Sequence, residues 1–273
     1  DLTWEKQALL TVGFNGRALD RFDFNIEYYH RTTSSMLMSV PYNYTTGFSS
    51  LYANVGGLVN QGIDITLGVD ILRGSDHYLR FNTTFNYNYE KVTELFNNLD
   101  RWEMVGYGYA YVVGKPVSFY YPIYAGVDPG DGAPMWYLPG DDIDKTTMDP
   151  NRVTKEFDEN GLTQNTGTRL NPPINGGFSL GGGWRGLSFQ ADFSYVLGKY
   201  LVNNDAFFYA NPNNNLDSTQ HKGVQDFWTP SNTDAVYPDW SKGYTMQFDT
   251  HLLEKADFLR LKNFQVAYDF PKR

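Results

Sequence analysis

Apolar and polar residues alternate strictly along several stretches of this chain. The clearest example runs from Gly62 to Tyr89, with a turn near residues 74–76. On either side of this turn, residues of one parity are apolar: Ile63, Ile65, Leu67, Val69, Ile71, Leu79, Phe81, Phe85, Tyr87 and Tyr89. The intervening positions are mostly polar. Because successive side chains of a strand point to opposite faces, this pattern predicts a hairpin with one apolar and one polar face.

The same alternation predicts about seven strands in the whole chain. The other stretches are 9–14, 21–38, 178–184, 187–195 and a last strand that includes 264–270. Two tight turns are expected, at 15–19, where Asn-Gly suits a short hairpin connection, and at Arg185-Gly186. Leu259 and Leu261 have the wrong parity for the last strand, which predicts a β-bulge or a position near a membrane surface.

Short and long connections alternate between these strands. Long loops are expected at about 40–58, 95–173 and 202–249, and the longest is rich in Pro, Asp, Asn and Gly. Short turns at one end and long loops at the other are typical of outer-membrane barrels. The predicted fold class is therefore all-β, an antiparallel transmembrane β-barrel segment. Seven strands cannot close a wide barrel, so residues 1–273 are expected to be an incomplete, internal part of a longer protein.

Composition narrows the possible functions. Charged residues make up only 19% of the 273 residues, against roughly 25% in ordinary soluble domains, and aromatic residues reach 17%. The net charge of −9 without a basic cluster argues against a nucleic-acid partner. The absence of cysteine excludes disulfides and thiolate metal sites. No apolar run approaches the roughly 18 residues of a transmembrane helix, but barrel strands give no such signal.

Five segments, in order, resemble the C-terminal half of SusC-like (SusC/RagA family) TonB-dependent transporters. They are DLTWEKQ at 1–7, DFNIEYYHRTTSSMLM at 23–38, NVGGLVNQGID at 54–64, YAGVDPGDGAP at 124–134 and ADFLRLKN at 256–263. Each motif alone is weak to moderate evidence. Together they cover most of the chain in the order found in that family.

The resemblance implies a multi-pass barrel of roughly 22 strands in the cell outer membrane, in contact with outer-membrane lipid. It also implies a SusD-like lipoprotein partner and energy from the TonB complex through an N-terminal part that this chain lacks. The implied activity is nutrient import, with an oligosaccharide as the expected cargo and a peptide as the alternative. The plug domain and the final strands would also lie outside residues 1–273. No enzymatic activity is expected.

Two groups of residues are candidates for contacts. The loop candidates for cargo or lipoprotein are Trp102, Tyr107, Tyr109, Tyr111, Tyr120, Tyr121, Tyr124, Asp128 and Asp131. Aromatic rings bury apolar area and leave a polar tip free. For any single ring, packing in an aromatic girdle or within the loop is the favoured explanation, and the contact function is expected only of the loop as a whole. The polar positions expected to face the lumen are Asp64, Arg80, Asn82, Asn86, Glu90, Gln190 and Asp192.

Other chemistry has weaker support. Acidic residues gather in the longest loop, where calcium is possible, but their spacing does not match an EF-hand and favours solvated turns: Asp128, Asp131, Asp141, Asp142 and Asp144. The four scattered histidines do not predict zinc, and Gly181–Gly183 lacks the spacing of a phosphate loop. The alternatives are a simple porin, a soluble carbohydrate-binding β-sandwich and, without a motif to recommend it, a glycoside hydrolase.

Overall fold

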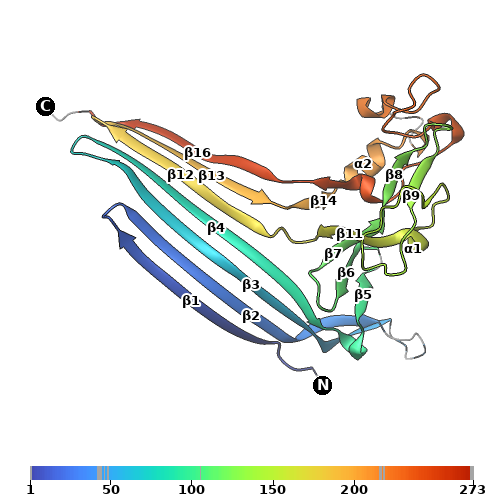
Figure 1. The fold of residues 1–273 in the computed structure, drawn as a ribbon, viewed down its shortest axis with the longest axis horizontal. Helices are drawn as coiled ribbons and strands as arrows, with labels where there is room; N and C mark the ends of the chain where they lie inside the picture. The colour runs from blue at the N-terminus through green and yellow to red at the C-terminus, as the bar shows by residue number, and fades with distance from the viewer. Residues whose placement is uncertain are drawn as a thin grey trace.

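The computed structural model describes residues 2–41, 45, 47, 49–104, 106–214, 217 and 219–270. Its largest element is a curved, wholly antiparallel sheet of seven strands (Figure 1). The strands are β1 (Lys6–Ala18), β2 (Phe22–Pro41), β3 (Ser50–Arg73), β4 (His77–Glu94), β12 (Ile174–Trp184), β13 (Leu187–Leu197) and β16 (Phe258–Tyr268). Among the described residues the sheet stays open, with β1 and β16 as its edges. The predicted all-β class is confirmed, but these seven strands alone do not close into a barrel.

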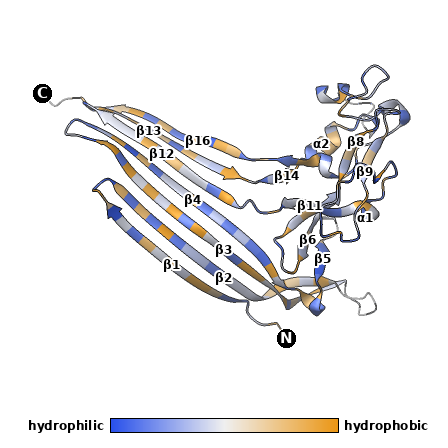
Figure 2. Cartoon of the chain, viewed as in Figure 1, coloured by the Kyte–Doolittle hydropathy of each residue, from blue (hydrophilic) through white to orange (hydrophobic). Residues whose placement is uncertain are grey.

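Strand register separates two faces of the sheet, and Figure 2 shows the resulting alternation of hydrophobic and hydrophilic positions along the strands. One cross-strand row is apolar: Phe14, Ile26, Ile65 and Phe85. The next row is polar: Asn15, Asn25, Thr66 and Thr84. The apolar face is not covered by another layer, and Phe14 is 68% exposed. An apolar surface of this extent marks a face that contacts lipid or another protein.

A bulge in β16 explains the apparent break in its apolar pattern. Asp192 pairs with Asn263, whereas the next residue, Phe193, pairs with Leu261, so that Lys262 is the extra residue. One extra residue reverses the parity of the strand on one side of it. Leu259 and Leu261 therefore share the apolar face with Phe264, and the predicted bulge is confirmed.

The short turns lie together at one end of the sheet (Figure 1). Arg185 and Gly186 form the predicted two-residue turn, both with positive φ, as a type I′ hairpin requires. The turn predicted at 15–19 is misplaced, because β1 continues to Ala18 and the chain reverses at Leu19 and Asp20, with φ of 50° and 52°. Gly16 stays in the strand because the Phe24 ring lies across it, 2.9 Å from where a Cβ would stand.

The long connections lie at the other end and are more structured than the sequence predicts. Strands β2 and β3 occupy most of the expected loop 40–58, since Pro41 pairs with Ser50. The 95–173 region contains η2 (Phe96–Asn98), β5 (Arg101–Met104), β6 (Tyr109–Val112), β7 (Ser118–Pro122), β8 (Tyr124–Val127), β9 (Pro134–Tyr137), β10 (Val153–Thr154), α1 (Glu159–Leu162) and β11 (Thr163–Arg169). Its strands form two small sheets, β11-β7-β6-β5 and β10-β9-β8.

The connection between β13 and β16 contains mainly short helices. Its elements are β14 (Tyr200–Val202), α2 (Asn204–Tyr209), η3 (Pro212–Asn214), η4 (Lys222–Gln225), η5 (Trp240–Lys242), η6 (Thr250–Leu252) and β15 (Leu253–Lys255). A small core holds them together: Ala206, Ala210, Val224, Met246 and Leu252. In the part of the chain that the structure describes, no helix combines the length and apolar character needed to cross a membrane.

Replacing Leu19 with glycine should stabilise the first hairpin. Leu19 has a positive φ, which costs a side-chain-bearing residue about 1–2 kcal/mol, and it is 83% exposed, so little packing is lost. After subtracting the extra entropy of glycine in the unfolded chain, we expect a net gain of up to about 1 kcal/mol. Equilibrium unfolding of the complete protein in detergent measures it. The control Leu19→Ala should be nearly neutral, and an equal gain in both variants would contradict the assigned turn.

Candidate functional site

A row of register partners crosses all seven strands near the short-turn end. Its members are polar or glycine: Arg17, Asp23, Gly68, Asn82, Ser179, Asp192 and Asn263. This row lies on the face opposite the apolar residues. An aqueous environment on this side of the sheet is consistent with such a row, because buried charges require partners or water.

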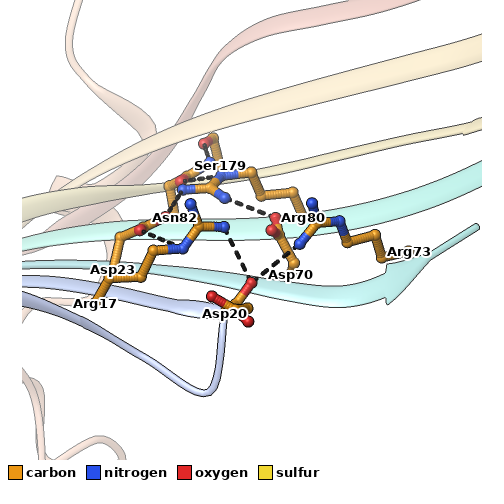
Figure 3. Close-up of polar contacts among 8 residues, drawn as sticks. All are labelled: Arg17, Asp20, Asp23, Asp70, Arg73, Arg80, Asn82 and Ser179. Carbon is orange, nitrogen blue, oxygen red and sulfur yellow. Dashed lines mark hydrogen bonds and ion pairs between the residues drawn. The ribbon is translucent and has the colours of Figure 1, made fainter.

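Arg80 in β4 is the centre of a group of hydrogen bonds and ion pairs beside this row (Figure 3). Its Nη1 donates to Asp70 Oδ1 at 2.6 Å, its Nη2 to Asp23 Oδ2 at 2.8 Å and its Nε to Asn82 Oδ1 at 2.9 Å. One guanidinium thus connects β2, β3 and β4. The planar fork of arginine suits such multiple, charge-assisted bonds.

The network reaches the first turn and β12. Arg17 and Arg73 donate to the backbone carbonyl of Asp20, at 3.0 and 3.2 Å, and Asn82 Nδ2 donates to Ser179 Oγ at 3.4 Å. We call these residues the Arg80 network: Arg17, Asp20, Asp23, Asp70, Arg73, Arg80, Asn82 and Ser179. Arg80 and Asn82 are among the predicted lumen-facing residues, and the alternation of polar residues also predicts that Asp23 and Asp70 lie on this face.

Gly68 lets the Arg80 side chain cross β3. Asp23 pairs with Gly68, and Gly68 pairs with Asn82, so β3 lies between Asp23 and the strand that carries Arg80. A Cβ on Gly68 would stand 2.5 Å from Arg80 Nη2 and 3.0 Å from Asn82 Oδ1. A side chain at this position would therefore displace the guanidinium from its path to Asp23.

The other predicted lumen-facing residues share this face, with one difference. Asp64 accepts from Asn86 at 2.6 Å, and Gln190 donates to Asp192 at 2.9 Å. Glu90 also has the polar parity, but it is buried and accepts from Asn171 Nδ2 at 2.9 Å. The folded 95–173 segment covers it. Glu90 is therefore a contact between the large sheet and this segment, and it does not lie on the open part of the polar face.

The predicted loop aromatics form a chain of ring contacts. The successive centroid distances are 5.0 Å for Phe96–Trp102, 5.8 Å for Trp102–Tyr111, 5.8 Å for Tyr111–Tyr109 and 6.2 Å for Tyr109–Tyr107. The middle members pack against a small buried core, whereas Tyr107 at the end is 68% exposed. Tyr107 is the member of this series best placed for an external contact.

Two predicted contact residues, Tyr120 and Tyr124, are largely buried. Tyr120 donates to Asp144 Oδ1 at 2.8 Å, and burial with this carboxylate raises its pKa well above the usual value. Tyr124 packs against Trp136 and His251. The expectation of exposed contacts is thus corrected for both, because their rings hold the loop segments together.

Tyr121 lines a hollow between the two long connections. The other lining residues include Glu103, Met104, Glu159, Asn160 and Phe248. The sequence pattern did not single out these five, since they come from separate segments with no common motif. The hollow combines carboxylates with aromatic rings, which can contact hydroxyl or amine groups and apolar surface together.

Asp128 and Asp131 are held by a lysine. Lys155 Nζ pairs with both carboxylates, at 2.5 Å from Asp128 and 2.9 Å from Asp131, and this pairing lowers the pKa of each. Asp128 also accepts from the Gly130 amide and Asp131 from the Ala133 amide. Over the described residues, no cluster of three or more His, Asp or Glu side chains is arranged to hold a metal. The lysine and the two backbone amides thus stabilise the turn that contains Asp128 and Asp131.

The two long connections are bound to each other through side chains. Trp136 Nε1 donates to Asp249 Oδ2 at 2.7 Å, and the Tyr124 amide donates to Thr250 Oγ1 at 2.9 Å. Trp228 Nε1 donates to the Pro129 carbonyl at 3.1 Å. These contacts join segments more than 90 residues apart into one unit, which we call the loop platform, formed by the described residues within 95–173 and 198–257.

Two neighbouring groups of the loop platform have opposite titration shifts. Burial raises the pKa of Asp249 to about 6, although its hydrogen bonds from Trp136 and the His251 amide act in the other direction. Burial also lowers the pKa of His251 below its usual 6.5, because it disfavours the charged imidazolium. Both groups therefore favour their neutral forms.

Comparisons with known proteins agree on one group. No family model matches the chain. It is 27% identical over 297 residues to TonB-dependent receptor P26 of Formosa agariphila, covering 99% of the chain and 28% of that receptor. It is 31% identical over 108 residues to TonB-dependent receptor P39 of the same organism, covering 39% of the chain and 10% of the receptor.

Solved structures give the same result. The RagAB peptide transporter matches with a TM-score of 0.89 and 38% identity, over 98% of this chain and 29% of that one. Its 'open-open' state matches with a TM-score of 0.86 and 38% identity, over 99% and 29%. The chain is a relative of the TonB-dependent receptors.

This relationship confirms the resemblance to SusC-like transporters that the sequence motifs carry. The matched proteins are named as receptors and a transporter, none as an enzyme, in agreement with the expectation of no enzymatic activity. The chain spans less than a third of the length of these relatives. The part that matches these relatives consists of the seven-stranded sheet and the loop platform.

Gly68→Ala should disconnect Arg80 from Asp23. The new Cβ displaces the guanidinium, so that a further Asp23→Asn change should cost little in the Gly68→Ala background but lower stability in the unmodified chain. A double-mutant cycle of equilibrium unfolding measures this coupling. Gly181→Ala is the matched control, because its nearest contact would be an ordinary 3.7 Å to the Phe189 carbonyl. Additive effects of Gly68→Ala and Asp23→Asn would contradict the crossing.

The stability of the loop platform should depend on pH in opposite directions in two single variants, His251→Phe and Asp249→Asn. With His251→Phe, Asp249 is the member of the pair that still titrates. Its raised pKa stabilises the contact between the two long connections fully below about 3.8, and this contribution is lost as pH rises towards 6. With Asp249→Asn, His251 is the member of the pair that still titrates, and its lowered pKa means that stability is lost as pH falls below about 6.5.

Thermal unfolding followed by tryptophan fluorescence between pH 4 and 7.5 checks this reversal, since Trp136 contacts Asp249 directly. We expect the midpoint to fall with rising pH in His251→Phe and to rise with pH in Asp249→Asn. Slopes of the same sign in the two variants would show that these residues do not control docking.

Proposed function

We propose that this chain forms part of the wall and outer loops of a TonB-dependent importer in the outer membrane. The observation that carries the proposal is the two-faced sheet: one face is apolar and uncovered, and the other carries the Arg80 network. Lipid would contact the first face and an aqueous lumen the second. The short turns would face the periplasm and the loop platform the cell exterior, as in other barrels of this membrane.

The free edges of the sheet support a larger barrel. β1 and β16 are 13 and 11 residues long, and each presents an unpaired row of backbone groups on its outer side. Such edges are unstable in lipid, where every backbone polar group needs a partner. Strands outside this chain would pair with them and complete a barrel of roughly 22 strands, the number typical of plugged transporters.

The uncovered apolar face argues against a soluble β-sandwich. In a sandwich, a second sheet packs on the apolar face of the first. Here the smaller sheets lie beyond the ends of the long strands (Figure 1), and residues such as Phe264 remain 65% exposed. A simple porin would conduct freely and would not need the TonB system.

A SusD-like surface lipoprotein is the proposed partner, and the loop platform is its proposed contact surface. The hydrogen bonds of Trp136 and Trp228 make this platform an ordered surface. Energy would come from the TonB complex through the N-terminal part of the complete protein.

The proposed cargo is a peptide, because the matched structures, 38% identical over nearly the whole chain, are of a peptide transporter. An oligosaccharide is the second candidate, favoured by the exposed ring of Tyr107 at the end of the aromatic series. Both classes offer polar groups for the hollow beside Tyr121.

Purification of the complete protein from outer membranes in mild detergent tests the proposal. We expect a stoichiometric lipoprotein to accompany it, and the purified complex to bind short peptides in preference to oligosaccharides. Tyr107→Ala should weaken cargo binding several-fold without changing lipoprotein recovery. Recovery of the protein alone in the aqueous fraction would overturn the importer, whereas preferential binding of oligosaccharides would change only the cargo.

An arginine on the apolar face should block assembly in the membrane. Ile65→Arg places a cation towards lipid, at a cost of about 2–4 kcal/mol near the midplane. Thr66→Arg, the next residue in β3, places the same side chain on the polar face. We expect Ile65→Arg to reduce the heat-modifiable folded form in outer membranes strongly and Thr66→Arg to leave most of it. A larger loss of the folded form in Thr66→Arg than in Ile65→Arg would show that the lipid-facing and lumen-facing sides have been assigned the wrong way round.

A further inference from the structure

An apolar hollow lies on the lipid-facing side of the sheet at its short-turn end. Its lining residues include Leu72, His77, Leu79, Trp184, Leu187 and Phe189, from β3, β4, β12 and β13. Its volume of about 450 Å³ falls within the roughly 300–1,000 Å³ of ligand-binding pockets. The Arg80 network and the loop platform do not include any of these residues.

Gly182 in β12 lets two side chains of the hollow lie close to the backbone. Leu79, Gly182 and Phe189 are register partners, and a Cβ on Gly182 would stand 2.5 Å from Phe189 Cε1 and 3.2 Å from Leu79 Cδ1. The Phe189 ring and the end of Leu79 therefore lie over Gly182 and form part of the lining. Trp184, two residues further along the same face, is 59% exposed and stands at the side of the hollow. The result is a trough between a tryptophan and aliphatic side chains that opens towards the membrane.

Charged groups of both signs lie at the turn end of this trough. Asp76 Oδ1 is 2.9 Å from His77 Nδ1, and Asp76 Oδ2 is 3.4 Å from Arg185 Nε. Arg185 also lies over the Trp184 ring, with its Cζ 5.3 Å from the ring centroid. All three charged or titratable side chains are exposed, so they can contact a headgroup without losing their mutual pairing.

We propose that this trough binds a zwitterionic phospholipid of the phosphatidylethanolamine type. One acyl chain would lie along Leu79, Leu187 and Phe189. The lipid phosphate would contact Arg185 and His77, and the ammonium group would contact Asp76. This inference rests on the proposed function, because it requires the apolar face to contact the membrane.

Charge complementarity selects this occupant over others. The rim carries a carboxylate between a guanidinium and an imidazole, which matches a headgroup with one phosphate and one amine. A purely anionic headgroup would leave Asp76 facing a second negative charge. A protein partner would have to reach the trough through the lipid next to the turns.

Native mass spectrometry of the complete protein with its partners tests the proposal. The delipidated complex is incubated with phosphatidylethanolamine or phosphatidylglycerol of the same acyl chains, and retained lipid is counted. We expect one phosphatidylethanolamine to be retained at least tenfold more strongly than phosphatidylglycerol. Asp76→Asn should remove this preference, and Leu187→Trp, which fills the trough, should reduce retention tenfold.

Phe264→Trp is the matched control, since it adds the same ring to the apolar face outside the trough. It should leave retention unchanged. Equal retention of both lipids, or equal loss in Leu187→Trp and Phe264→Trp, would overturn the site and leave ordinary lipid contact. In that case recovery of the complex from the membrane would still support the importer. Recovery in the aqueous fraction without lipid would overturn both.

Discussion

The strand register is the constraint on which the rest of this structure depends. Side chains alternate with a period of two, so a slip of one residue between neighbouring strands would exchange the apolar and polar faces. The Arg80 side chain opposes such a slip between β2, β3 and β4, because it reaches Asp70 on the adjacent strand β3 and Asp23 on β2 beyond it. The bulge at Lys262 illustrates the same constraint. The apolar residues of β16 change parity there, and the one extra residue keeps them on the apolar face of the sheet.

The loop platform depends on a different kind of interaction. Its strands are short, and its integrity comes from side chains that connect segments distant in sequence, such as Trp136 with Asp249 and Trp228 with the Pro129 carbonyl. Small separate cores support it: one around Leu252 in the last connection, and one around Val92 and Val117 where the wall meets the first. The large sheet is therefore specified mainly by its register and the platform by side-chain contacts, and the two share residues only where they meet, around Glu90 and Val92.

This difference explains what could be predicted from the sequence. The seven strands, their faces and the bulge follow from a two-residue period that is visible locally. The first turn was misplaced because Asn-Gly is a strong local turn signal, whereas the Phe24 ring that keeps Gly16 in the strand comes from the partner strand. The same reason explains two features that the sequence did not predict: the burial of Tyr120 and Tyr124, and the pairing of Lys155 with Asp128. Each depends on residues that are distant in sequence and are brought together by the folded loops.

The Arg80 network also has a consequence for anything that moves past it. It contains three arginines and three aspartates, so its formal charges cancel within one small area of the wall. A cancelled set of charges produces a field that decays quickly with distance. This part of the inner surface would therefore be hydrated but electrostatically quiet, with little tendency to retain a charged solute or to respond to the salt concentration around it.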